Sequence, residues 1–168
     1  MRLRLIRHAT LLVEIGGRRV LIDPMLDPAG ARPAVADTPN DRRNPLCELP
    51  EPAEVLVRRL DAVLVTHLHA DHLDETAVDL LPKDVPLVCQ PPDEGVLRDR
   101  GDVLGGHRDR VALGEAGAAH APGAQVVAVH LEAINHCLQT RADLHQRLHV
   151  EGLERRVTVP EDGALVPV

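Results

Sequence analysis

The sequence predicts a single α/β domain in which strands and helices alternate along the chain. Apolar runs of strand length recur, segments with helical spacing follow several of them, and Pro- or Gly-rich stretches separate the two kinds. Such alternation is typical of layered α/β folds. Because 168 residues can bury one hydrophobic core, we expect one domain over residues 1–168.

The first fifty residues predict three strands and a long loop. The strands are apolar or alternating runs at residues 2–6, 11–15 and 19–22. Gly16-Gly17, between the second and third, is typical of a hairpin turn. After Asp23-Pro24, residues 24–50 are rich in Pro, Asp and Asn and predict a loop over the surface.

The remaining predicted elements are short. Helices are expected at residues 52–60, 74–81 and 93–100, and strands at residues 62–65, 85–89, 125–129 and 156–159. Residues 101–123 hold six glycines among charges and alanines, which predicts a flexible connector. Thr140 should cap a last helix, with Asp143 in its first turn and Leu144 and Leu148 on one face.

Charge and hydropathy exclude several classes of function. The formal charge is −7 and the isoelectric point about 5.8, so the chain lacks the basic face that binding to nucleic acid or an anionic membrane requires. No apolar run is long enough to cross a membrane, and the N-terminus lacks the apolar region of a signal peptide. Cys47, Cys89 and Cys137 lack the spacing of a disulfide framework. They indicate reduced thiols in a cytoplasmic protein.

Phe, Trp, Tyr and Ser are all absent from the chain. Aromatic residues normally supply much of the buried area of a domain. We interpret this absence as deliberate removal in an engineered, reduced-alphabet chain rather than as natural drift. The core must then be built from Leu, Val, Ile and Ala, which predicts marginal stability or a mobile core.

The segment His67-Leu68-His69-Ala70-Asp71-His72 carries the strongest functional signal. It follows a predicted strand, so its side chains lie at the rim of the sheet, where α/β proteins bind ligands. Imidazole nitrogens and carboxylate oxygens are ligands of zinc, manganese and iron. His67 and His69 point the same way in an extended segment, whereas Asp71 and His72 fall in the following turn. The spacing favours two metal ions, one for each pair, over a solvated loop or a structural zinc site.

With this motif the chain resembles the metallo-β-lactamase-fold hydrolases. Residues 8–14 and 21–24 are similar to the opening of the branch that includes the ascorbate-phosphate lactonases, and residues 126–136 resemble its closing strand. The resemblance covers residues 1–100 and 123–160. It implies an αβ/βα sandwich of mixed sheets flanked by helices. The metal ligands that it implies are His67, His69, Asp71, His72 and, after the closing strand, His130.

The middle of the chain departs from this family. Members carry further strands there, with a third histidine ligand and a bridging aspartate, where this chain has only residues 101–123. His107 is a candidate for the missing histidine, with chance placement equally open, and Asp102 or Asp109 is a candidate for the aspartate. The resemblance therefore implies a truncated sandwich with one or two ligands unassigned.

Other polar residues give weaker signals. His136 is a metal ligand, a residue that orients one, or a plain polar residue. Asp23 either orients a metal-binding histidine or initiates a turn. His145 and His149 predict a solvated helix face. Residues 6–10, which include His8, are similar to the motif of the histidine phosphatases, but the next strand begins too soon for a phosphate-binding loop.

Two hypotheses for function follow. In the first, the protein is a hydrolase in which up to two ions of zinc, or alternatively manganese or iron, activate water for attack on an ester, lactone or phosphodiester bond. His67 and His69 would hold one ion, and Asp71, His72 and His130 the other. Asp71 would also act in catalysis by orienting the water.

In the second hypothesis, the missing ligands leave a designed or truncated metal-binding fold that is barely active or not catalytic. The missing strands would also expose apolar edges, so we expect a homodimer or larger assembly.

Overall fold

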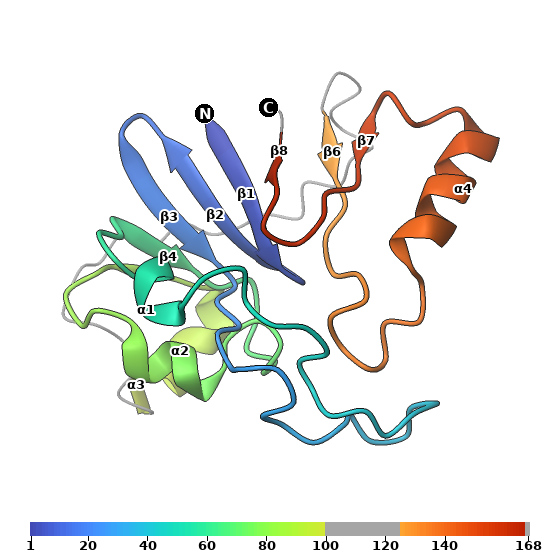
Figure 1. Cartoon of the computed structure of the whole chain (residues 1–168). Coiled ribbons are helices and arrows are strands. Elements are labelled where there is room, and N and C mark those ends of the chain that lie inside the picture. Colours follow the sequence, from blue (N-terminus) through green and yellow to red (C-terminus); the bar gives the residue numbers. More distant parts are fainter. Residues whose placement is uncertain (100–124, 167–168) are drawn as a thin grey trace.

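The computed structural model describes residues 1–99 and 125–166 (Figure 1). Its largest element is a six-stranded mixed sheet with the order β5-β4-β3-β2-β1-β8. The strands are β1 (Arg2–Arg7), β2 (Thr10–Ile15), β3 (Arg18–Ile22), β4 (Ala62–Leu64), β5 (Leu87–Val88) and β8 (Leu165–Val166). This sheet and its helices confirm the mixed α/β fold class. The predicted connector at residues 101–123 lies outside the described residues.

Four strands of the sheet run in the same direction. β2 is antiparallel to both β1 and β3, and β4 and β5 continue the sheet parallel to β3. The carboxyl ends of β1, β3, β4 and β5 therefore meet at one rim, which is where α/β sheets bind ligands. The β2–β3 hairpin turns at Gly16 and Gly17, with φ of 58° and 77°, as the sequence predicted.

Three short helices pack on the part of the sheet formed by β3 and β4 (Figure 1). They are α1 (Ala53–Leu56), α2 (Glu75–Leu80) and α3 (Glu94–Asp99), which follows a 3₁₀ turn at Pro91–Asp93. Leu56, Ala77 and Leu97 are fully buried in an aliphatic core shared with the strands. α1 is shorter than the helix predicted at residues 52–60: it ends at Leu56, with Val57 as its C-cap. Arg59, with a left-handed φ of 54°, keeps a helix from reaching Leu60.

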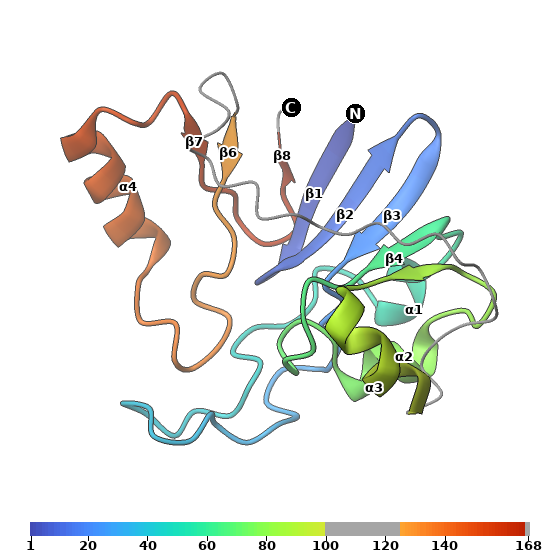
Figure 2. The same ribbon diagram turned by 180° about the vertical axis from the view of Figure 1, so that it is seen from behind.

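Residues 126–158 lie beside β8, at the opposite end of the molecule from α1–α3 (Figures 1 and 2). β6 (Val126–Val127) and β7 (Val157–Thr158) form a separate parallel pair, and α4 (Arg141–Glu151) lies beside them. The predicted cap of α4 is confirmed, since Thr140 and Asp143 form a reciprocal capping box. β6 and β7 are shorter than the predicted strands, and β8 was not predicted.

Residues 24–50 form the predicted loop, and one buried arginine holds it at the rim. The Arg7 guanidinium, at the end of β1, donates hydrogen bonds to the carbonyl oxygens of Met25 at 2.8 Å, Asp27 at 2.9 Å and Cys47 at 2.8 Å. The loop therefore runs beside the carboxyl ends of the strands. Within the two described ranges, no helix combines the length and apolar character that a membrane crossing needs.

Candidate metal centre

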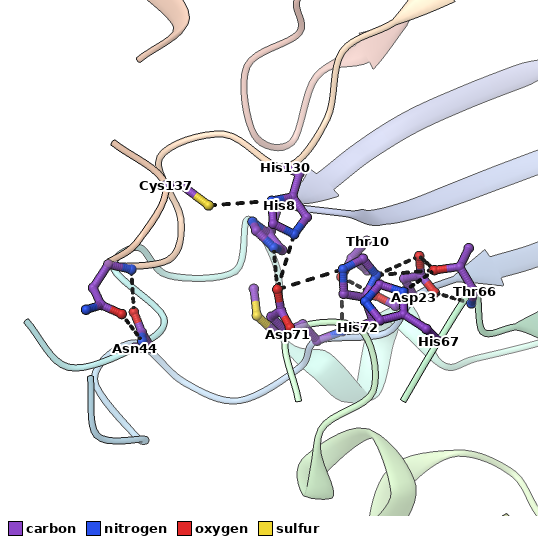
Figure 3. A network of polar contacts seen from close by, with 12 residues as sticks. His8, Thr10, Asp23, Asn44, Thr66, His67, Asp71, His72, His130 and Cys137 are labelled. Atoms are coloured by element: carbon purple, nitrogen blue, oxygen red, sulfur yellow. Dashed lines mark hydrogen bonds and ion pairs between the residues drawn. The ribbon is translucent and has the colours of Figure 1, made fainter. Parts of the chain in front are cut away.

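The candidate site residues come from four separate segments at the carboxyl rim of the sheet (Figure 3). His8 follows β1, Asp23 follows β3, and the His67–His72 segment follows β4. His130 belongs to the loop after β6, and its backbone N–H donates to the carbonyl oxygen of His8 at 2.9 Å. This backbone bond joins the C-terminal part of the chain to the rim.

Four side chains converge on one point, namely His8, Asp71, His72 and His130. The Oδ2 atom of Asp71 lies 3.1 Å from Nε2 of His8, 3.2 Å from Nε2 of His130 and 3.8 Å from Nε2 of His72. One ligand atom from each of the four residues lies within 4.8 Å of all the others. In residues 1–99 and 125–166, this is the one group of three or more such side chains close enough to share an ion.

The charges in the cluster favour the binding of a cation. Burial alone would raise the pKa of Asp71, but hydrogen bonds to His130 and His8 hold that pKa well below its usual range. The bond to Asp71 is the main cause that raises the pKa of His130 to about 10. Burial lowers the pKa of His8, which keeps that imidazole neutral and its lone pair available. An ionised carboxylate among three imidazoles attracts a cation, whether a proton or a metal ion.

The donor set and its burial fit a divalent transition metal. Three imidazole nitrogens and one carboxylate oxygen suit zinc, and manganese and iron accept the same donors. The His8 side chain is 0% exposed, Asp71 is 15% exposed and His130 is 36% exposed. The cluster is therefore closed on the side of β1 and reaches solvent at His130, so a water molecule has access from that side.

Asp23 and Thr66 hold the ring of His72 in place. The Oδ2 atom of Asp23 lies 2.9 Å from Nδ1 of His72, and the Thr66 hydroxyl donates to the same oxygen at 2.8 Å. The other carboxylate oxygen accepts a hydrogen bond from the Thr66 backbone N–H at 2.7 Å. Carboxylates orient metal-binding histidines through contacts of this kind. The orienting role of Asp23 stays a prediction, and this contact is its geometric basis.

His67 and His69 form a separate pair beside the cluster. Their ring centroids are 4.5 Å apart, and the His67 ring lies 3.8 Å from that of His72. In the part of the chain that the structure describes, neither belongs to a group of three candidate ligands. Their predicted partner, His107, lies outside the described residues, so the site predicted for the first ion stays a prediction.

Three residues at the site have left-handed backbone conformations. The φ angles are 60° at His8, 46° at Asp23 and 70° at His130. Residues other than glycine rarely adopt this region, and the backbone strain that they store there is found mainly at functional sites. The conformation therefore supports a functional role for this rim.

The sequence interpretation missed two members of the site. His8 was noted in the stretch that resembles the opening of the family branch and in a phosphatase motif, but it was not predicted to be a metal ligand. The β1–β2 and β2–β3 pairings make β1 parallel to β3 and so place His8 on the same rim as Asp23. Cys137 was interpreted only as a reduced thiol, whereas its Sγ atom lies 3.5 Å from Nδ1 of His130. His136, a predicted alternative ligand, is exposed, with its ring centroid 6.1 Å from that of His130.

The profile of the Beta-lactamase superfamily domain matches residues 18–158. The chain belongs to this superfamily. The resemblance to metallo-β-lactamase-fold hydrolases that the sequence indicated is therefore confirmed.

Two curated relatives differ in how much of the chain they match. UPF0173 protein YddR from Bacillus subtilis (strain 168) is 26% identical over 249 aligned positions, which cover 97% of this chain and 98% of YddR. Because that alignment is longer than the chain, YddR has residues with no counterpart here. UPF0173 metal-dependent hydrolase PAE2160 from Pyrobaculum aerophilum is 34% identical over 80 residues, or 48% of this chain and 28% of PAE2160.

Two solved structures are similar to this chain in fold. Isothiocyanate hydrolase from Delia radicum gut bacteria has a TM-score of 0.82 and 26% identity, and the match covers 100% of this chain and 99% of that one. A possible metal-dependent hydrolase from Veillonella parvula DSM 2008 has a TM-score of 0.83 and 20% identity, with the same coverage. The predicted metallo-β-lactamase-like architecture is therefore confirmed.

Proposed function

We propose that the protein is a metal-dependent hydrolase in which water activated by a bound metal ion attacks an ester, lactone or phosphodiester bond. The observation that carries this proposal is the convergence of four ligand atoms within 4.8 Å at the carboxyl rim of the sheet. The names of PAE2160, of the Veillonella parvula protein and of isothiocyanate hydrolase support hydrolysis as the class of reaction.

The residues divide between two ions. Asp71, His72 and His130 would hold one ion, and His67 and His69 would contribute to the other. We expect zinc, with manganese or iron as alternatives, because all three accept imidazole and carboxylate ligands. A bound divalent cation lowers the pKa of water toward 7 and so supplies a nucleophile at neutral pH.

The chain's own groups would position that water. The Asp71 carboxylate is ionised at neutral pH, because hydrogen bonds to His130 and His8 offset the cost of its burial and lower its pKa. It can therefore accept a hydrogen bond from water on the exposed side of the cluster and turn the oxygen lone pair toward substrate. His130 borders that exposed side, so we place the approach of substrate there.

A second candidate function is metal binding with little or no turnover. It is favoured by the His67–His69 pair, which has no third ligand among the described residues. The alignment with YddR, which is longer than this chain, points the same way, because residues of that relative have no counterpart here. In this case the four-residue cluster would bind an ion without catalysing hydrolysis.

Metal analysis combined with activity measurements separates the two candidates. The probes are a nitrophenyl ester, a lactone, a nitrophenyl phosphodiester and an isothiocyanate, each tested on the parent, Asp71→Ala and Asp79→Ala proteins. Asp79 is an exposed carboxylate on α2 and serves as the control. We expect bound metal and turnover in the parent and in Asp79→Ala, and loss of both in Asp71→Ala.

Other outcomes are equally informative. Metal binding without turnover on every probe would support the second candidate. Turnover that persists in Asp71→Ala, or after a chelator has removed the metal, would refute the hydrolase proposal.

A further inference from the structure

His8 is absent from the ligand set that the family resemblance implied, yet its Nε2 atom lies as near to Asp71 as that of His130 does. We propose that His8 is a fourth protein ligand of the ion held by Asp71, His72 and His130. This inference rests on the proposed function, since it concerns the same metal centre. We further expect this ion, with three histidines and one aspartate as ligands, to be held more tightly than the ion at His67 and His69.

The distances from Oδ2 of Asp71 to the three imidazoles fit a four-coordinate ion. With metal–ligand bonds of about 2.0–2.1 Å, ligand atoms at the corners of a tetrahedron are about 3.3–3.4 Å apart. The three distances from Oδ2 of Asp71 to the Nε2 atoms of His8, His130 and His72 are 3.1, 3.2 and 3.8 Å, which bracket that separation. His8 therefore meets the distance requirement as well as the two histidines already assigned.

The backbone holds His8 in this position. Its φ of 60° turns the residue out of β1, and its carbonyl oxygen accepts a hydrogen bond from the backbone N–H of His130 at 2.9 Å. As a result the rings of His8 and His130 lie 3.7 Å apart, on the same carboxylate oxygen. Two histidines from segments 122 positions apart are thus held together by main-chain contacts, before any ligand is considered.

The surroundings of the His8 ring leave it one polar partner. The side chain is 0% exposed, and its Nδ1 atom is buried without a hydrogen-bond partner. Among the described residues, the hydrogen bond of the ring is the one to Asp71. Buried polar side chains are normally satisfied by several partners. The ring therefore directs Nε2 into the cluster, so Nε2 is the atom that would bind the ion.

The number of available ligands predicts which of the two ions binds more tightly. His67 and His69 offer two imidazoles, and no third candidate ligand joins them in the described ranges. The first equivalent of metal should therefore enter the cluster that contains His8. Zinc with four protein ligands can accept a fifth, so this assignment remains compatible with activation of water.

Zinc affinity, measured by competition with a chromophoric chelator, tests the assignment on the full chain. The main variant is His8→Asn, because asparagine tolerates the left-handed φ at this position but its short side chain removes the imidazole. His145→Asn, on the exposed face of α4, is the matched control. A third variant, His67→Asn/His69→Asn, removes the neighbouring pair.

We expect His8→Asn to bind the first zinc ion more than about 100-fold more weakly, beyond the range typical of residues that only orient a ligand. The control and the double variant should stay within about threefold of the parent. Equal affinity in His8→Asn and the control would overturn the inference alone. A parent protein that binds neither zinc nor manganese nor iron would overturn the proposed function with it.

A measurement on the parent protein covers the case in which His8→Asn does not fold. Imidazole ¹⁵N spectra recorded during zinc titration report which histidine rings bind the ion. One equivalent of zinc should shift a ring nitrogen of His8, His72 and His130 and leave His67 and His69 unchanged. Unchanged ring nitrogens of His8 would overturn the inference.

Discussion

The Nδ1 atom of His72 lies 2.9 Å from the Oδ2 atom of Asp23, and neither side chain is more than 7% exposed. The contact joins the end of β3 to the turn after β4. It leaves Nε2 of His72 directed toward Asp71. Because a buried carboxylate at this position fixes the ring that would bind the ion, Asp23 should govern metal affinity without touching the metal.

Asp23→Asn tests this relationship. Asparagine tolerates the φ of 46° and can still accept the Thr66 N–H, but its amide lacks the charge that orients the imidazole. We expect zinc affinity to fall about 10–100-fold, as measured by chelator competition.

The control for Asp23→Asn is Asp61→Asn, since Asp61 also accepts a backbone N–H, that of Arg19, but lies away from the rim. Its zinc affinity should match that of the parent. If Asp23→Asn binds zinc as tightly as this control, the His72 ring does not need a carboxylate to orient it.

The reactivity of Cys47 should depend steeply on pH. Burial raises the pKa of its thiol to about 11, and the nearby Asp162 adds to the shift. Because the thiolate is the reactive form, about one thiol in a thousand is ionised at pH 8. Alkylation by iodoacetamide, followed by mass spectrometry of the Cys47 peptide, should therefore accelerate about tenfold per pH unit up to about pH 11. A rate that levels off below pH 9 would contradict this.

The capping box of α4 should contribute to stability. The Thr140 side chain accepts a hydrogen bond from the Asp143 N–H, and the Asp143 carboxylate accepts one from the Thr140 N–H. Thr140→Ala should lower the free energy of unfolding in urea by about 1 kcal/mol. Thr140→Ser keeps the hydroxyl and should retain most of the stability. Equal losses in both variants would assign the effect to the methyl group instead.

Local sequence patterns predicted the elements whose formation depends on neighbouring residues. The β2–β3 hairpin followed from its apolar runs and from Gly16-Gly17, and the start of α4 followed from Thr140 and Asp143. β8 could not be predicted in this way. It has two residues, and its formation depends on pairing with Leu3 and Arg4 at the other end of the chain.

The same distinction applies to the metal centre. Asp71 and His72 were predictable because they belong to one short motif. His130 was predicted from its place after a strand together with the family resemblance. His8 lies 63 positions before Asp71, so no spacing connects them. Their proximity depends on the order and direction of β1, β3 and β4, which is set by strand pairing rather than by local sequence.

We also predict that the protein is a homodimer or larger. The six-stranded sheet ends at β8, and Leu165 in this edge strand is 67% exposed. Unpaired edges with apolar side chains favour association between chains. Light scattering at micromolar concentration should give a mass of at least about twice the 18.3 kDa chain.

Leu165→Lys should lower that mass toward one chain, because a charge on an edge strand opposes pairing. Val150→Lys, which changes a residue 74% exposed on α4, should leave the mass unaltered. A parent protein with the mass of a single chain would refute the prediction.

Arg7 should be the main attachment of the 24–50 loop to the sheet. Its side chain is fully buried, and burial lowers its pKa, although a guanidinium remains charged at neutral pH. Arg7→Met would leave the carbonyl oxygens of Met25, Asp27 and Cys47 without this donor. Because each unsatisfied buried group costs about 1–3 kcal/mol, we expect the free energy of unfolding in urea to fall by at least about 3 kcal/mol.

Arg43→Met provides the matched control. Arg43 also donates to two loop carbonyls, those of Gly30 at 2.7 Å and Ala31 at 2.8 Å, but its side chain is exposed. Water can replace those two bonds, so the control should change stability by no more than about 0.5 kcal/mol. A similarly small loss in Arg7→Met would refute this role of Arg7 and leave the contacts between Asn44 and Asn135 as the next attachment to test.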